Sequence, residues 1–180
     1  MKTLEVPITI DIRCSGLGSE DITDQIRTAV IATAHAKGFD LGSIGVLITD
    51  DQTIHEINRS HLQHDYATDV ISFAYEQQPP RIEGELVASL DTAAREAAEL
   101  GWPVLNELLL YVVHGVLHIC GMDDQSAESR RQMRIVEQQV LSSLGIPNAS
   151  DYDPDDCDPD VPLDEAARHH VEPYSSIHNS

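Results

Sequence analysis

The sequence predicts one α+β domain in which a small mixed β-sheet of about four strands is packed by about five or six helices. Short apolar segments typical of strands lie mainly in the first half of the chain, whereas the second half contains three consecutive segments with helical patterns. The length of 180 residues is enough for one domain with a sizeable core and a tail.

The order of the elements follows from their periodicity. The first helix has a clear start, because Asp21, Thr23 and Asp24 place capping and acidic side chains ahead of its apolar positions. The segment Gln77-Gln78-Pro79-Pro80 predicts a turn between two strands. In chain order, we expect a strand at 3–12, a helix at 21–37, a strand at 44–49, a helix at 51–62, strands at 70–75 and 85–89, and helices at 90–100, 103–120 and 126–144.

The composition changes near Gly145, which predicts a folded domain over residues 1–146 and an acidic, disordered tail over 147–180. From Asp151 onward the chain has nine of its 31 acidic residues but one of its 11 basic residues. The formal net charge is -20 for the whole chain and -12 without that segment, so the domain itself is strongly acidic. The tail histidines His169, His170 and His178 would bind metal only adventitiously.

The sequence does not indicate a membrane or secreted protein. It contains no run of about 18 apolar residues, and its N-terminus lacks the uninterrupted apolar stretch of a signal peptide. Cys14, Cys120 and Cys157 are scattered and provide neither a disulfide framework nor a paired zinc motif. We therefore expect a cytoplasmic protein with no membrane partner.

Two histidines four residues apart lie on the apolar helix expected at 103–120. His114 and His118 are on one face of that helix, one turn apart, where both imidazoles can bind one metal ion. Gly121 is expected to end the helix, so that Asp123 or Asp124 turns back toward the histidines. Three protein ligands with an open fourth position are typical of a catalytic zinc site.

Each of these residues also has a structural explanation. A histidine in an apolar helix can be a hydrogen-bonded core residue, and Asp124 can cap the helix that follows. Burying two imidazoles without a common partner costs several kcal/mol, which favours metal binding for the histidine pair. For Asp124, both explanations stay open.

The residues near the histidines argue against a zincin-type protease. The His-Glu-x-x-His motif requires a glutamate where this chain has Gly115, and the sequence lacks a nucleophile elbow and a Walker loop. Asp123, Asp69 and Glu85 are the remaining acid/base candidates, although each is also explained as a cap, turn or surface residue. Glu107 lies two turns before the first histidine, too far for direct contact.

The segment from His114 to Asp124 resembles the signature of the YbeY-type endoribonucleases, metal-dependent enzymes of ribosomal RNA maturation, which reads His-Gly-x-Leu-His-x-x-Gly-Tyr-Asp-His. Met122 and Asp124 replace the tyrosine and the third histidine of that signature. Segments 58–73 and 84–89 are similar to two further family segments, so the resemblance spans about residues 3–146. The matching signature residues are His114, Gly115, Leu117, His118, Gly121 and Asp123.

The resemblance implies a zincin-like metal-site helix and a zinc-dependent endoribonuclease that cleaves single-stranded RNA. One zinc ion per chain would be held by His114, His118 and Asp124, and His114 and Asp123 are the catalytic candidates. The implied role is late maturation of small-subunit ribosomal RNA and ribosome quality control, with the small ribosomal subunit as a partner and without DNA as a substrate. Attack by water and attack by the 2′-hydroxyl of the RNA both stay open.

Two residues depart from the family pattern. Leu62 occupies a position where many members have an arginine thought to serve catalysis, and Arg59, three residues earlier, is a weak substitute. Asp124 places a negative charge where the family has a neutral imidazole, which is compatible with zinc but makes the ion a weaker Lewis acid. We therefore expect a higher pH optimum or a different metal preference.

The acidic charge is the main argument against RNA as the substrate, because binding of phosphates normally depends on Lys and Arg. Arg130, Arg131 and Arg134 form a small basic rim near the site, unless they pair instead with Glu128 and Glu137. Three functions stay open: the endoribonuclease, a metal-dependent hydrolase of another substrate, and a metal-stabilised ribosome-associated factor with little turnover.

Overall fold

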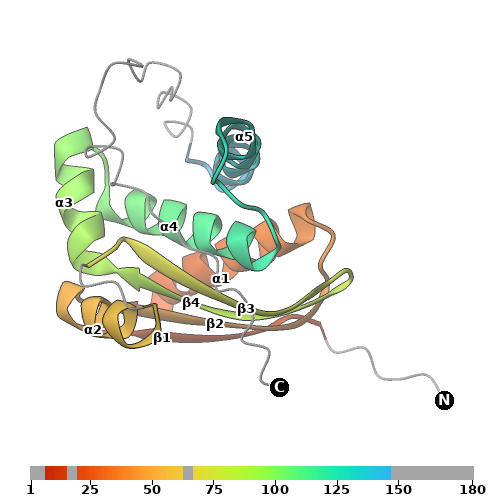
Figure 1. The fold of residues 1–180 in the computed structure, drawn as a ribbon. Helices are drawn as coiled ribbons and strands as arrows, with labels where there is room; N and C mark the ends of the chain where they lie inside the picture. The colour runs from red at the N-terminus through yellow and green to blue at the C-terminus, as the bar shows by residue number, and fades with distance from the viewer. Residues whose placement is uncertain (1–6, 16–19, 63–66, 147–180) are drawn as a thin grey trace.

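The computed structural model of the chain describes residues 7–15, 20–62 and 67–146. These residues form a single small α+β domain with a four-stranded sheet and five helices (Figure 1). The strands are β1 (Thr9–Cys14), β2 (Leu41–Thr49), β3 (Val70–Gln78) and β4 (Arg81–Ser89). The helices are α1 (Glu20–Ala36), α2 (Asp51–His61), α3 (Leu90–Leu100), α4 (Val104–Ile119) and α5 (Ala127–Ser143).

The sheet is mixed and has the strand order β1-β2-β4-β3. β2 runs parallel to both β1 and β4, whereas β3 and β4 form an antiparallel hairpin. In this register, Val46 lies beside Leu86 and Val70 lies beside Ala88. All four of these side chains are buried, as expected for strands that carry a layer of helices.

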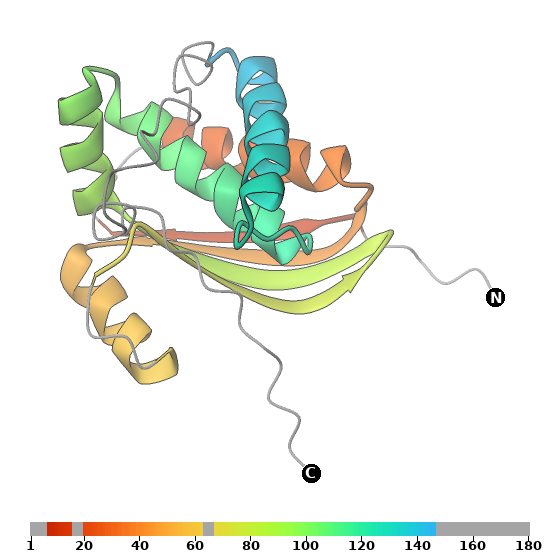
Figure 2. The same cartoon turned by 45° about the horizontal axis from the view of Figure 1, so that its top comes forward.

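α4 is the central helix of the molecule, because it contacts α1, α3, α5, β3 and β4. Figures 1 and 2 show it between the sheet and the outer helix α5. The side chains of Leu108, Val112, Val116 and Ile119 are at most 1% exposed. This burial on several sides explains why the sequence of α4 is apolar almost all round.

Two glycines allow α4 to lie close to the sheet. A Cβ atom at Gly84 of β4 would lie 2.5 Å from Cγ2 of Ile119 and 2.6 Å from a backbone oxygen. A Cβ atom at Gly115 of α4 would lie 3.1 Å from both Oγ of Ser72 and Cγ2 of Val70. Larger residues at these positions would push the helix away from the sheet.

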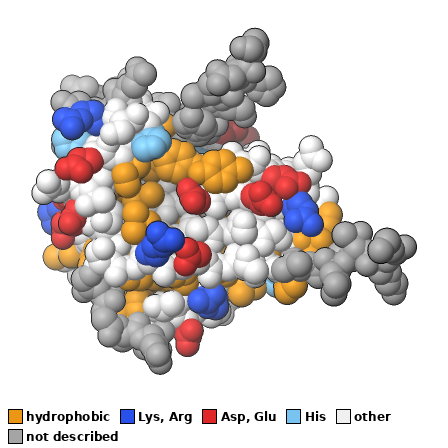
Figure 3. Space-filling view, turned by 90° about the horizontal axis from the view of Figure 1, so that it is seen from below, with side chains coloured by type: hydrophobic (Ala, Val, Ile, Leu, Met, Phe, Trp, Pro, Cys, Tyr) orange, Lys and Arg blue, Asp and Glu red, His pale blue; other side chains and the backbone are white. Residues whose placement is uncertain are grey.

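Among the described helices, α2 packs on the opposite face of the sheet, at one end (Figures 1 and 2). There, Ile54 of α2 joins Ile71, Phe73 and Val87 in a second, smaller apolar cluster. Elsewhere on this face, charged, polar and apolar side chains are interspersed (Figure 3).

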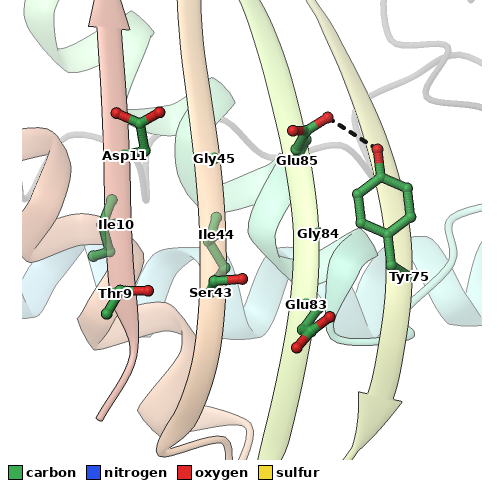
Figure 4. A pocket seen from close by; sticks show the side chains of 10 residues that line it. All are labelled: Thr9, Ile10, Asp11, Ser43, Ile44, Gly45, Tyr75, Glu83, Gly84 and Glu85. Carbon is green, nitrogen blue, oxygen red and sulfur yellow. Dashed lines mark hydrogen bonds between the residues drawn. The ribbon is translucent and has the colours of Figure 1, made fainter. Parts of the chain in front are cut away.

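A hollow of about 360 Å³ lies on this second face and is lined by residues of all four strands (Figure 4). Asp11, Glu83 and Glu85 contribute carboxylates to it, and the hydroxyl of Tyr75 donates a hydrogen bond of 2.9 Å to Oε2 of Glu85. Glu85 therefore lies on the side of the sheet away from α4, because successive residues of a strand face opposite sides and Gly84 faces α4.

The predicted fold class is confirmed, and the type of every predicted element is correct. Each helix begins and ends within one residue of the predicted boundary, but β2, β3 and β4 are longer than predicted. The prediction that Gln77 and Gln78 belong to the turn is wrong, because β3 continues through them and the turn consists of Pro79 and Pro80. An antiparallel hairpin that projects toward solvent keeps its backbone pairing without apolar side chains, so hydrophobicity does not reveal its length.

Two predictions fall on residues beyond the described ranges. The strand predicted at 3–12 is observed from Thr9 and runs on to Cys14, whereas residues 1–6 are not described. The tail predicted at 147–180 lies outside the described residues. Within the described part, no single helix is long and apolar enough to span a membrane; α3 and α4 meet that test only as a pair bent by 119°.

Candidate metal centre

His114 and His118 face each other near the end of α4. Their Nε2 atoms are 3.0 Å apart. His118 is 5% exposed and the side chain of His114 is 17% exposed. The structure therefore brings the two predicted ligands together in a site that is largely closed to water.

The chain turns back after α4 and brings Asp124 to the histidines. Gly121 has a φ of 92°, a left-handed conformation that favours glycine and ends the helix. Oδ2 of Asp124 then lies 3.9 Å from Nε2 of His114, and its side chain is 13% exposed. One donor atom from each of His114, His118 and Asp124 lies within 4.8 Å of the other two.

The residues just after Asp124 cap the N-terminus of α5. Ser126 is the N-cap, its hydroxyl accepts a hydrogen bond of 3.0 Å from the backbone N–H of Ser129, and the Ser129 side chain returns the interaction. The alternative in which Asp124 caps α5 is therefore wrong. Its carboxylate is instead directed toward the histidine pair.

The donor set fits a divalent metal ion. In a tetrahedral zinc site with bonds near 2.1 Å, neighbouring donor atoms lie roughly 3.4 Å apart, and the observed separations of 3.0 and 3.9 Å bracket that value. Burial, together with the neighbouring His114, lowers the pKa of His118 to about 3. His118 is therefore neutral near pH 7, as a metal ligand must be.

Glu137 of α5 contacts the other side of the His114 ring. Nδ1 of His114 and Oε1 of Glu137 form a short hydrogen bond, and Glu137 is 8% exposed. Burial alone would lower the pKa of His114, but the charge of Glu137 and its hydrogen bond, with help from Asp69 and Asp124, raise that pKa. The imidazole thus lies between a buried carboxylate and the candidate metal site.

The contact between Glu137 and His114 was missed by the sequence analysis, which paired Glu137 with arginines of its own helix. The sequence of α5 does contain a sign of this contact. Glu137 shares a helical face with Met133, Val140 and Leu141, and all three are buried. An acidic residue in an apolar stripe requires a polar partner on a neighbouring element. The identity of that partner cannot be read from the stripe.

Arg130 holds the loop that carries Asp124. Its Nη1 donates hydrogen bonds of 3.0 Å to the carbonyl oxygen of Asp124 and 3.2 Å to that of Gln125. The suggested pairing of the arginines with Glu128 is not observed for Arg130, and Glu128 accepts instead from Gln132 at 2.7 Å. Arg131 is exposed and Arg134 is half-buried on the same helix.

The acid/base candidates near the site have different surroundings. Asp123 is exposed, and its Oδ1 accepts a hydrogen bond of 3.1 Å from the backbone N–H of Gln125, as in a turn. Asp69 is 7% exposed, and its Oδ1 accepts from the Thr68 hydroxyl and from the backbone of Val70. Asp69 therefore fixes the start of β3 beside the centre.

The other two acidic residues considered from the sequence lie elsewhere. Glu85 is on the far side of the sheet, so the structure does not bring it to the centre. Glu107 is buried and accepts a hydrogen bond of 2.8 Å from Nε1 of Trp102. That contact connects the beginning of α4 to the turn before it.

The structure explains the residue types at positions 115 and 62. Gly115 faces the sheet rather than the metal centre, and its carbonyl accepts a hydrogen bond of 3.0 Å from Ser72. A glutamate at that position would collide with β3 and β4. Leu62, at the C-cap of α2, packs on the apolar cluster formed by Ile54 and its neighbours, so its side chain serves packing.

The fold and this geometry define a class: an α+β protein with a candidate mononuclear metal centre at the end of its central helix. The model of a protein family described as Endoribonuclease YbeY matches residues 11–145. The chain belongs to the YbeY endoribonuclease family.

Individual relatives agree with this assignment. The chain is 54% identical over 138 residues to Endoribonuclease YbeY of Rhodopirellula baltica, covering 74% of this chain and 71% of that protein. It is 35% identical over 138 residues to Endoribonuclease YbeY of Phocaeicola vulgatus, covering 76% and 99%. The solution structure of TM1509 from Thermotoga maritima has the same fold, with a TM-score of 0.55 and 21% identity over 81% of this chain and 98% of that one.

Proposed function

We propose that this protein is a zinc-dependent endoribonuclease whose ion is held by His114, His118 and Asp124. The observation that carries the proposal is the convergence of their three donor atoms within 4.8 Å on the segment that matches the family signature. The relatives are named as endoribonucleases, which supports RNA as the substrate class.

Each residue of the centre has a separate task in this proposal. His118 supplies a neutral nitrogen from a buried position, and Asp124 supplies a negative charge from the loop after α4. When bound, zinc supplies a Lewis acid for a phosphate oxygen and increases the acidity of water. His114 and Asp123 are the proposed catalytic residues; Asp123 is exposed next to the ligand Asp124, where substrate has access.

The proposed substrate is single-stranded RNA, cleaved during late maturation of small-subunit ribosomal RNA and in ribosome quality control in the cytoplasm. The small ribosomal subunit is the proposed partner, and neither DNA nor a membrane is involved. Family membership supports this assignment. Docking on a ribosome would also reduce the need for positive charge on a domain that is strongly acidic.

One observation favours a second candidate, a metal-dependent hydrolase of a less highly charged substrate. At the position of the family arginine, Leu62 is used for packing against an apolar cluster, so it offers no cation for a phosphodiester transition state. Cleavage of RNA by the purified protein separates the two candidates.

Metal content and RNA cleavage should be measured on the same preparations of wild type, Asp124→Ala and His118→Ala. We expect about one zinc ion per wild-type chain, with both metal and cleavage of single-stranded RNA lost in the two variants. Asp11→Ala, which removes an exposed carboxylate on β1, is the matched control and should retain both. A wild type without bound transition metal would contradict the proposal, and zinc without RNA cleavage would favour the second candidate.

A further inference from the structure

Glu137 is a buried carboxylate that contacts the candidate metal centre without being one of its proposed ligands. It lies on α5, 23 positions after His114, and its Oε1 contacts Nδ1 of that residue. Both side chains are largely withdrawn from solvent, at 11% and 17% exposed. An ionised carboxylate only accepts hydrogen bonds, so Nδ1 of His114 is the donor.

This contact determines which nitrogen of His114 is available to a metal ion. A neutral imidazole has one N–H group, and when that group is on Nδ1 the lone pair is on Nε2. Nε2 is the atom that lies 3.0 Å from Nε2 of His118 and 3.9 Å from Oδ2 of Asp124. Without an acceptor at Nδ1, the proton can occupy Nε2, where it blocks metal binding.

The same carboxylate places a negative charge behind the ring. A hydrogen-bonded anion makes the opposite nitrogen a stronger electron donor and holds the ring in one orientation. The position of Glu137 is itself well fixed, because neighbours on the same face of α5, Met133, Val140 and Leu141, are at most 4% exposed. The packing of α5 on α4 therefore fixes the position of Glu137, and through it the orientation of the His114 ring and its Nε2 atom.

We propose that Glu137 is a positioning residue of the metal centre, which holds the proton of His114 on Nδ1 and thereby directs Nε2 to the ion. The inference rests on the proposed metal site and extends it to a residue on another helix. Glu137 acts through His114 and contacts neither the ion nor the substrate.

Zinc affinity is the primary test, measured with Zn²⁺ alone in competition with a chromophoric chelator. Glu137→Ala should bind zinc 10–100-fold more weakly than wild type, the usual effect of removing such a partner. Glu137→Gln keeps an acceptor oxygen but loses the charge, so its loss should be smaller, under about tenfold. Glu128→Gln removes a carboxylate from the exposed face of the same helix and should bind zinc as the wild type does.

The tautomer of His114 provides a second measurement that a purely structural role would not change. Nitrogen-15 NMR of the metal-free protein should show the His114 proton on Nδ1 in wild type and in Glu137→Gln. In Glu137→Ala, the metal-free protein should show a mixture of the two tautomers. If Glu137→Ala does not fold, Glu137→Gln decides: weaker zinc binding with an unchanged tautomer supports the inference, and unchanged affinity overturns it.

Failure of this inference can be distinguished from failure of the proposed function. A wild type that binds zinc, together with a folded Glu137→Ala variant of equal affinity, overturns the role of Glu137 and leaves the metal centre intact. A wild type that binds no zinc overturns both.

Discussion

At the scale of single residues, the substitution of aspartate for the third histidine of the family signature is the main chemical departure of this chain. Asp124 occupies the place in space that a third ligand requires, 3.9 Å from Nε2 of His114. Glu137, on the far side of the His114 ring, adds a second carboxylate close to the candidate centre, although it does not contact the ion. Both reduce the positive charge that an ion presents to substrate.

Asp124→His should therefore move the pH profile of RNA cleavage to lower pH. A neutral ligand in place of an anionic one leaves the ion a stronger Lewis acid, and we expect a shift of about one pH unit. The measurement is the cleavage rate between pH 6 and 9, with metal content determined on the same samples. A profile that does not move, at equal metal content, would show that the charge of residue 124 does not set the pH optimum.

The convergence of the three candidate ligands was predictable from sequence, whereas their supporting contacts were not. His114 and His118 follow from helical spacing, and the return of Asp124 follows from a glycine that ends the helix. The contact of Glu137 depends on the rotation of α5 against α4, which no local pattern encodes. Glu85, in contrast, could have been set aside from sequence, since its strand neighbour Leu86 is apolar and adjacent strand residues face opposite sides.

At the scale of elements, a polar network connects the N-termini of α2 and α3. Oδ1 of Asp51 accepts from the hydroxyls of Ser89 and Thr92, and Oδ2 accepts from Nη1 of Arg95 at 2.6 Å. Burial raises the pKa of Asp51, but the hydrogen bonds from Ser89, Arg95 and Thr92 outweigh it and lower that pKa. The network thus attaches α2, the helix on the opposite face of the sheet, to the helical layer.

Asp51→Asn should destabilise the protein by about 1–3 kcal/mol at pH 7, because it removes charge-assisted hydrogen bonds. A carboxyl group with a lowered pKa in the folded state stabilises above its unfolded pKa, and that contribution is lost as the pH falls through the folded value. The urea midpoints of wild type and variant should therefore stay apart at pH 7 and converge only as the pH falls below about 4.

Asp11→Asn is the control for the effect of charge alone. Asp11 pairs with Arg13 at 3.3 Å, and both side chains are more than 70% exposed. Exposed pairs of this kind contribute little, so the midpoint should hardly change at either pH. A difference between wild type and Asp51→Asn that is constant with pH would contradict the role of the Asp51 charge.

At the scale of the whole molecule, element types were predictable but the strand order was not. Val46 of β2 lies beside Leu86 of β4, 40 positions later, although β3 comes between them in the chain. That pairing depends on how β2 and β4 pack together under α4, a long-range property. Periodicity reveals which residues form a strand and which face is apolar, but not its neighbour.

The charge of the molecule limits how it can bind RNA. The chain without the segment from Asp151 onward has a formal net charge of -12, and Figure 3 shows basic side chains interspersed with acidic ones on one face. Near the candidate centre, the arginines of α5 are the cations available from that helix, and Arg130 already binds two carbonyl oxygens of the loop. Few phosphates can therefore be neutralised there.

The salt dependence of RNA binding should consequently be shallow. Each phosphate contact in a single strand contributes about -0.7 to the slope of log affinity against log salt, so two or three contacts give a slope no steeper than about -2. Arg131→Ala should make the slope less steep by about 0.7, whereas Arg13→Ala, on β1, should leave it unchanged. Fluorescence anisotropy with a labelled single-stranded RNA between 50 and 200 mM salt, about a fourfold range, measures this slope. A slope steeper than about -4 would require more phosphate contacts than the arginines of α5 can supply. The basic surface would then have to lie on another part of the protein.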